Sequence, residues 1–242
     1  MEKFIEKLVK KQKDNYGQPS VTVAFLGDSV TQGCFDIYQN KAGSFEPVFD
    51  KKSAYHTYFA EIFSVLCPNV PVNIINAGIS GSNAPHGLER LERDVLHYNP
   101  DLVVVCFGLN DSRCGATGIK QYTDSLAEIF DRLQDIGSEI IFMTPNMMCT
   151  DVSGCLKDEL LTKTAAETAK IQNAGMLDNY LEAAKALCRE KNITVCDCYA
   201  KWKRLETLGF DVTELLSNKI NHPTREMNWL FAYSLAETIL GL

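Results

Sequence analysis

Short, almost continuous apolar runs recur along the chain, and most are followed by a segment whose apolar residues have helical spacing. Such runs are typical of parallel strands buried on both faces, and an apolar stripe with a period of about 3.6 residues is typical of surface helices. The runs predict five strands, at 21–26, 72–76, 102–107, 139–144 and 193–197. The stripes predict helices near 53–66, 84–98, 119–135 and 165–191, and a last helix that starts after Pro223 and runs toward Leu240.

Strands and helices that alternate at these lengths predict an α/β fold, a three-layer α/β/α sandwich with a central parallel sheet of about five strands. No internal repeat, low-complexity tract or Pro/Gly/Ser-rich linker divides the chain, so we predict one domain over residues 1–242. Sheets of this kind bind ligands at the carboxyl ends of their strands. The loops to search begin at Gly27, Ala77, Gly108, Pro145 and Cys198.

Charge and hydropathy narrow the classes of partner. The net charge of −7 attracts no polyanion, so neither nucleic acid nor an anionic membrane is a predicted partner. No apolar run approaches the roughly 18 residues of a membrane span. The N-terminus is charged and lacks the apolar core of a secretory signal, and Phe4, Ile5, Leu8 and Val9 fit one face of a short helix instead. These features predict a cytoplasmic protein.

The nine cysteines have irregular spacing and form no CxxC pair. Several lie inside apolar runs, as Cys106 does, which favours reduced, buried thiols in a cytosolic protein over a disulfide framework. A metal site built on Cys196 and Cys198 would have no second cluster to complete it, so we predict no metal.

The first strand ends in Gly27-Asp28-Ser29. A serine directly after a strand, in a tight turn assisted by glycine, projects from the edge of the sheet, and its own backbone N–H can point at a bound oxygen. The alternative is a helix N-cap, because Ser and Asp both favour that position. The segment matches neither the Walker loop, nor GxGxxG, nor the GxSxG elbow.

Two further strands end in loops with candidate chemistry. The segment from Asn76 to Asn83 holds Gly78 and Gly81, which permit a close approach of the backbone to a ligand, although a flexible loop is the alternative. In Gly108-Leu109-Asn110-Asp111, the amide of Asn110 can donate into the same cleft. The alternative there is an Asx turn made by either polar residue.

The fourth candidate precedes the last helix, in Asn218-Lys219-Ile220-Asn221-His222-Pro223. Pro223 suits a first helical turn, which would place His222 at the start of that helix. A surface or capping role is the alternative for a lone histidine in such a place. The other three histidines fall in predicted helices or their starts.

Taken together and in order, the four segments resemble the SGNH hydrolases, also called GDSL lipases or esterases, which are named for Ser, Gly, Asn and His in four sequence blocks. The blocks cover residues 27 to 223, and the matching residues are Ser29, Gly81, Asn110 and His222. The resemblance implies the flavodoxin-like form of the α/β/α sandwich. It also implies an esterase that needs no cofactor.

The resemblance assigns a role to each block. Ser29 would attack the acyl carbon, and His222 would take its proton and give it to the leaving alkoxide. The backbone N–H groups of Ser29 and Gly81 and the side-chain amide of Asn110 would hold the oxyanion. We interpret Asp28 and Asp111, which belong to the motifs, as loop-ordering groups.

The sequence departs from the family where an acid should orient the histidine. The family usually has Asp three residues before the His, and Lys219 stands there. Three interpretations stay open. A backbone carbonyl, or a side-chain oxygen of Asn218 or Asn221, orients His222 in a Ser-His dyad, which we favour. A distant carboxylate reaches it, or activity is degraded; the distant candidates are Asp197, Asp211 and Glu214.

Substrate identity depends on loops whose sequence is less informative. Segments 34–50, 146–155 and 199–210 are expected near the site, and the first carries four aromatic residues that either pack locally or contact a sugar or acyl chain. We predict a small, soluble ester with a short acyl group, such as an acetylated carbohydrate. A thioesterase, a lysophospholipase or a catalytically impaired ligand-binding protein are the alternatives. A flavin or phosphate binder is disfavoured, and the oligomeric state stays open.

Overall fold

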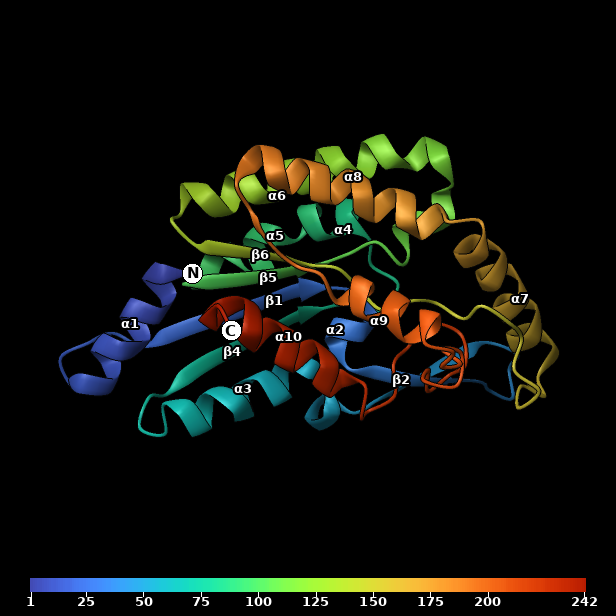
Figure 1. Ribbon diagram of the computed structural model, residues 1–242, viewed down its shortest axis with the longest axis horizontal. Coiled ribbons are helices and arrows are strands. Elements are labelled where there is room, and N and C mark those ends of the chain that lie inside the picture. Colours follow the sequence, from blue (N-terminus) through green and yellow to red (C-terminus); the bar gives the residue numbers. More distant parts are fainter.

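Five parallel strands form the central sheet of the computed structural model, which describes residues 1–242 (Figure 1). They are β1 (Val21–Gly27), β4 (Val72–Gly78), β5 (Leu102–Cys106), β6 (Glu139–Met143) and β7 (Thr194–Cys196). Their spatial order is β4-β1-β5-β6-β7. Counted along the chain, this is the 2-1-3-4-5 order of the flavodoxin-like fold. The predicted fold class and all five strands are therefore confirmed.

Helices cover both faces of this sheet (Figure 1). On one face lie α4 (Ala84–Glu89), α5 (Leu91–Asp94), α6 (Ile119–Asp135) and α8 (Met176–Lys191). On the other lie α1 (Glu2–Lys13), α3 (Tyr55–Leu66) and α10 (Asn228–Leu240), with α9 (Cys198–Thr207) beside α10. Short 3-10 turns are η1 (Lys51–Ser53), η2 (Leu96–Tyr98), η3 (Asp111–Cys114) and η4 (Ala116–Gly118). None of the helices has the length and apolarity needed to cross a membrane.

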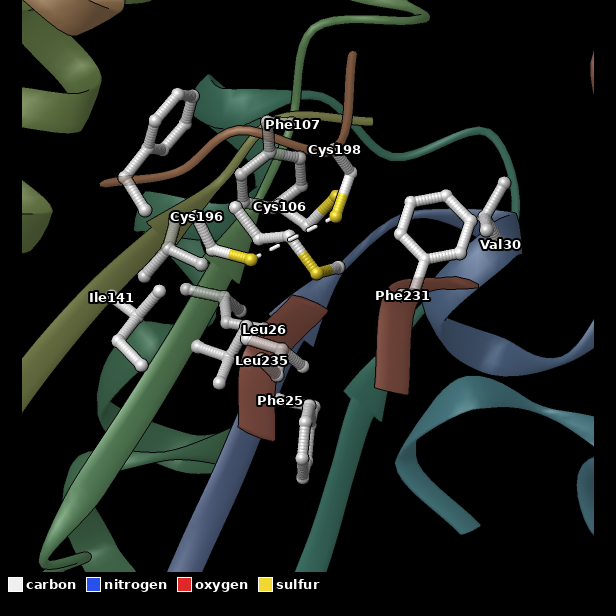
Figure 2. Packing of buried hydrophobic residues seen from close by; sticks show 14 of the residues in the cluster. Phe25, Leu26, Val30, Cys106, Phe107, Ile141, Cys196, Cys198, Phe231 and Leu235 are labelled. Carbon is white, nitrogen blue, oxygen red and sulfur yellow. Dashed lines mark hydrogen bonds between the residues drawn. The ribbon is translucent and has the colours of Figure 1, made fainter. Parts of the chain in front are cut away.

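The core forms where the sheet meets these helices. Phe25 of β1 packs edge-on against Tyr55 and Phe59 of α3. Figure 2 shows Leu235 of α10 near Leu26 of β1, and Phe231 of α10 on the side of Val30 of α2. Strands β1 and β5 are buried on both faces, which explains why their sequences show no alternation of apolar and polar residues. The rigid sheet fixes the positions from which the loops leave its carboxyl edge.

Two predicted helices prove to be interrupted. The stretch 165–191 belongs to α7 (Glu159–Asn173) and α8, because the chain turns at Gly175, whose φ is 69°. The stretch 84–98 divides into α4, α5 and η2, and the first break falls at Arg90, whose side chain turns inward under the strand ends. A periodic pattern does not register such breaks, since the apolar face continues across them.

Figure 1 shows α2 (Ser29–Gln32), α7, α9 and a hairpin gathered beyond the carboxyl edge of the sheet. The hairpin pairs β2 (Cys34–Gln39) with β3 (Phe45–Phe49) in antiparallel fashion. Its strands lie outside the main sheet and mix exposed aromatic with charged residues. They therefore lack the apolar run that marks a buried strand.

Candidate active site

The turn after β1 brings Ser29 to the carboxyl edge of the sheet. Asp28 is the N-cap of α2, and its Oδ1 accepts the N–H of Val30 at 2.9 Å. The sequence left open whether Asp28 or Ser29 forms the helix N-cap, and the structure shows that it is Asp28. A side chain at Gly78 would collide with the backbone of Gln32, so this glycine lets α2 lie directly against β4. Ser29 is only 4% exposed, and its hydroxyl remains for another partner.

That partner is His222. Ser29 Oγ lies 2.9 Å from His222 Nε2, although the two residues are 193 positions apart. The histidine is 2% exposed. Burial lowers its pKa to about 4, against the smaller upward effects of a bond to the Phe35 carbonyl and of the charge of Asp36. The imidazole is therefore neutral at neutral pH and can accept the hydroxyl proton.

The predicted helix start at Pro223 is wrong. The last helix begins at Asn228, and Pro223 instead pairs with Leu216 in an isolated antiparallel bridge. Ser217 N–H donates to the His222 carbonyl at 2.7 Å, which closes the loop on itself. Proline fits this bridge because the pairing of Leu216 with Pro223 uses no hydrogen bond from the N–H that proline lacks. His222 is therefore held by a closed loop, and the helix begins six positions after it.

Two groups contact the other nitrogen of the imidazole. His222 Nδ1 lies 3.2 Å from the Phe35 carbonyl oxygen and 3.1 Å from Asn218 Nδ2. The Asn218 oxygen is engaged elsewhere, because Oδ1 accepts the backbone N–H groups of residues 220, 221 and 222. Its NH2 group must therefore face the histidine. Asn218 thus presents a donor where the sequence suggested an accepting oxygen, and the side chain of Asn221 bonds only to the Asn218 amide.

These two contacts favour opposite tautomers of His222. The Phe35 carbonyl accepts a proton on Nδ1, which leaves Nε2 free to take the proton of Ser29. The Asn218 NH2 group favours a bare Nδ1, which places the proton on Nε2 instead. The first tautomer is the one that base catalysis needs.

None of the three distant carboxylates considered from sequence bonds to His222. Glu214 pairs with Lys219 at 3.0 Å, Asp197 binds Thr144 and Lys185, and Asp211 accepts the N–H groups of its own turn. The nearby carboxylate is Asp36, which sequence reasoning missed. It follows Phe35 in β2 and accepts the Ser217 hydroxyl at 2.5 Å. Only the unrecognised hairpin would have pointed to it.

The loop that carries Gly81 is fixed on both sides. Ser80 N–H donates to the side chain of Gln32 at 2.7 Å, and the Ser82 carbonyl accepts from Asn110 Nδ2 at 2.8 Å. Gly81 itself has a φ of 77°, a conformation that strains other residues. Neither its backbone N–H nor that of Ser29 donates to another group of the chain. Both N–H groups, and the second hydrogen of the Asn110 amide, remain free for a ligand oxygen.

Two buried carboxyls lie next to these loops. Burial raises the pKa of Asp28 to about 7 and that of Asp111 to about 6. Asp111 Oδ1 accepts the Ala84 N–H at 2.9 Å, which ties the Asn110 loop to the start of α4. Neither carboxyl bonds to Ser29 or His222, so their contacts are those of loop-ordering groups.

The amino-acid sequence matches a known protein family over most of the length of the chain. A model of the GDSL-like Lipase/Acylhydrolase family matches residues 25–230. The chain belongs to this family. The match includes all four loops described above and ends inside α10.

Individual relatives are distant. An acetylxylan esterase of Geobacillus stearothermophilus is 31% identical over 87 residues, which are 36% of this chain and 38% of that protein. An arylesterase of Vibrio mimicus is 33% identical over 72 residues, which are 30% and 36% of the two chains. The matched stretches thus span less than two-fifths of the length of either relative.

Solved structures agree with the fold over nearly the whole chain. Axe2, an acetylxylan esterase from Geobacillus stearothermophilus, aligns with a TM-score of 0.65 at 19% identity, over 90% of this chain and 94% of that one. The acetyl xylan esterase AlAXEase aligns with a TM-score of 0.67 at 20% identity, over 90% and 100%. At such identities the likeness establishes the shared fold.

Proposed function

We propose that the protein is a serine esterase that removes a short acyl group, such as acetyl, from a soluble alcohol such as a carbohydrate. The observation that carries the proposal is the 2.9 Å contact between Ser29 Oγ and His222 Nε2, beside unpaired N–H donors. The distant acetylxylan esterase and arylesterase relatives support an ester as the bond attacked.

In the acylation step, Ser29 Oγ attacks the acyl carbon while its proton passes to His222 Nε2. The carbonyl oxygen becomes an oxyanion, held by the N–H groups of Ser29 and Gly81 and by the amide of Asn110. His222 then gives its proton to the leaving alkoxide as the ester bond breaks. Water then attacks the acyl-serine and gives a proton to His222, which returns it to Ser29 Oγ as the carboxylic acid leaves.

A Ser-His dyad operates here, with Phe35 in the orienting role. Its carbonyl accepts the Nδ1 proton of His222 and so selects the reactive tautomer. A carbonyl carries only a partial negative charge, so it stabilises the imidazolium less than a carboxylate would. The proposed enzyme therefore has the groups for catalysis but a weakly supported base.

The hairpin provides a surface for the alcohol part of the substrate. Phe35 is buried with the Arg225 guanidinium 4.5 Å above its ring, so it packs locally. Tyr38, Phe45 and Phe49 are exposed on the strands that lead away from the His222 contact. Exposed rings next to an active site suit stacking on a sugar.

Substrate and chemistry are tested together. Purified protein is incubated with p-nitrophenyl esters of increasing acyl length, acetylated xylo-oligosaccharides and an acetyl thioester. We expect the acetyl esters to be cleaved fastest. A fluorophosphonate should stop hydrolysis and add its mass to the peptide that contains Ser29. Hydrolysis no faster than in buffer, with no labelled serine, would contradict the proposal.

The pH dependence of kcat/KM follows from the buried histidine. Only neutral His222 can accept the Ser29 proton, and its pKa is lowered to about 4. We expect kcat/KM for p-nitrophenyl acetate to stay level from neutral pH down to about pH 5 and then to fall as His222 becomes protonated. Circular dichroism at each pH separates this loss from acid unfolding.

The position of this limb distinguishes the groups involved. A limb near 6.5, the ordinary value for histidine, would contradict the burial of His222. One near 6 or 7 that disappears in Asp111→Asn or Asp28→Asn would assign control to those carboxyls, whose pKa values are raised to about 6 and about 7.

We further propose a cytoplasmic location. Six of the nine cysteines are buried as free thiols, and Cys196 and Cys198 hold their sulfurs 3.7 Å apart in the core (Figure 2). Thiols kept in this way suit a reducing compartment. Fractionation of the cells that make the protein tests the location, and recovery outside the cytoplasm would contradict it.

A further inference from the structure

We propose that Arg90 is a positioning residue that fixes the geometry of the oxyanion hole; this inference rests on the proposed esterase function. Arg90 lies between α4 and α5 and is 7% exposed. Its Nη2 donates to the Gly27 carbonyl at 2.8 Å, and its Nη1 donates to the Ala77 carbonyl at 2.6 Å. These carbonyls belong to the last residue of β1 and the last but one of β4, two residues before Ser29 and four before Gly81.

The same guanidinium reaches the third donor through Ser82. Nη2 lies 3.4 Å from the Ser82 hydroxyl, and the Ser82 carbonyl accepts the Asn110 amide at 2.8 Å. Two of the proposed oxyanion donors, Ser29 and Gly81, therefore stand on segments that Arg90 joins, and the third, Asn110, bonds to one of these segments. The Ile79 N–H also donates to the Gly27 carbonyl, at 3.2 Å. This carbonyl oxygen therefore connects the β1 turn both to the Gly81 loop and to Arg90.

Packing alone does not hold this loop. A cavity of about 530 Å³ lies between residues 79–82 and the α4–α5 segment, where it is lined by His86, Glu89, Arg90 and Arg93. A side chain built at Gly81 would meet no atom within 4 Å. With open space beside the loop, its hydrogen bonds set its position. Arg90 contributes a short charge-assisted bond to the Ala77 carbonyl, just before the loop, and a longer one to the Ser82 hydroxyl at its end.

The cost of burying Arg90 also indicates a role beyond stability. Its Nε is buried without a partner, and Asp94 is the one carboxylate that forms an ion pair with it, at 3.2 Å from Nη1. Replacing a buried ion by an apolar side chain of similar volume is often neutral or stabilising. What an apolar residue would not provide is a rigid planar fork that binds two carbonyls at once.

Arg90→Met tests this with matched kinetics. A displaced oxyanion donor weakens binding of the transition state more than binding of the substrate. We expect kcat for p-nitrophenyl acetate to fall about tenfold while KM changes by less than about twofold. The affinity for a phenylboronic acid, whose serine adduct places an oxygen in the hole, should fall by the same factor. Arg93→Met is the control, because Arg93 is 72% exposed and bonds only to Asp94.

Each outcome decides the inference. An Arg90→Met protein that folds and keeps both the wild-type kcat and the boronate affinity overturns it, even if its melting temperature falls. If that variant does not fold, Arg90→Lys replaces it, since lysine keeps the charge but reaches one carbonyl. The lysine variant should then lose kcat and boronate affinity in parallel, and wild-type values would overturn the inference. An inactive wild-type protein that binds no boronate would instead defeat the esterase proposal.

Discussion

Replacing Ser29 with alanine is expected to lower kcat for p-nitrophenyl acetate by about a thousand-fold. The change removes the only hydroxyl in contact with His222 Nε2. In a complete triad, loss of the serine costs about two-million-fold and loss of the acid alone about thirty-thousand-fold, so a serine and histidine without any orienting group retain about seventy-fold. The Phe35 carbonyl supplies part of the missing orientation, which places the expected loss above that lower limit.

The neighbouring Ser80 provides the control for this prediction. Ser80 is exposed in the Gly81 loop, and its contact with Gln32 is made by the backbone N–H. Ser80→Ala should therefore keep its activity within about twofold. Ser29→Ala should also lose fluorophosphonate labelling while its unfolding curve stays close to that of the wild type. Wild-type hydrolysis by Ser29→Ala would remove Ser29 from the mechanism.

The parts of the fold that the sequence predicted are those in which burial alone determines the pattern. The run at 102–107 is apolar at every position because β5 is covered on both faces, and 119–135 matches α6 residue for residue. The hairpin at 34–49 was missed because its residues are neither uniformly buried nor regularly alternating. The start of α10 was misplaced because Pro223 satisfies a bridge as readily as a helix start.

The candidate site also contains residues that short sequence motifs predicted and residues that they could not predict. Ser29, Asn110 and His222 follow their strands or precede their helix in short motifs, so the sequence could name them. Phe35 could not be named, because it contacts His222 through a backbone carbonyl that any residue would carry, 187 positions away. Nor could Arg90, whose helix pattern continues unbroken around it.

The missing acid shows how local backbone geometry limits inference from spacing. Lys219 has a φ of 57°, and its side chain turns away to Glu214. The residue that faces the imidazole is Asn218, one position earlier. Spacing alone had identified Lys219 as the substitute for the acid, whereas the structure places Asn218 in contact with the base.

Asn218→Asp is therefore expected to raise kcat by about a hundred-fold, or about 2.7 kcal/mol. Its Oδ1 can keep the three backbone bonds, and its second oxygen would replace the NH2 group that lies 3.1 Å from His222 Nδ1. A donor that opposes the reactive tautomer thus becomes a charged acceptor that favours it. The gain stays below the about ten-thousand-fold effect of the acid in a protease triad, because this carboxylate would be buried where Asn218 is only 7% exposed.

The pH profile separates this mechanism from a general effect of added charge. A carboxylate in contact with the imidazole raises the pKa of His222, so the acid limb of kcat/KM should move upward from about 4 in Asn218→Asp. Asn221→Asp adds the same charge on a side chain that is linked to the imidazole only through the Asn218 amide, and its kcat should stay within about threefold of the wild type. An Asn218→Asp protein that folds but is no faster than Asn221→Asp would contradict the prediction. The Phe35 carbonyl would then be the group that alone sets the tautomer, because reversing the second contact would have had no effect.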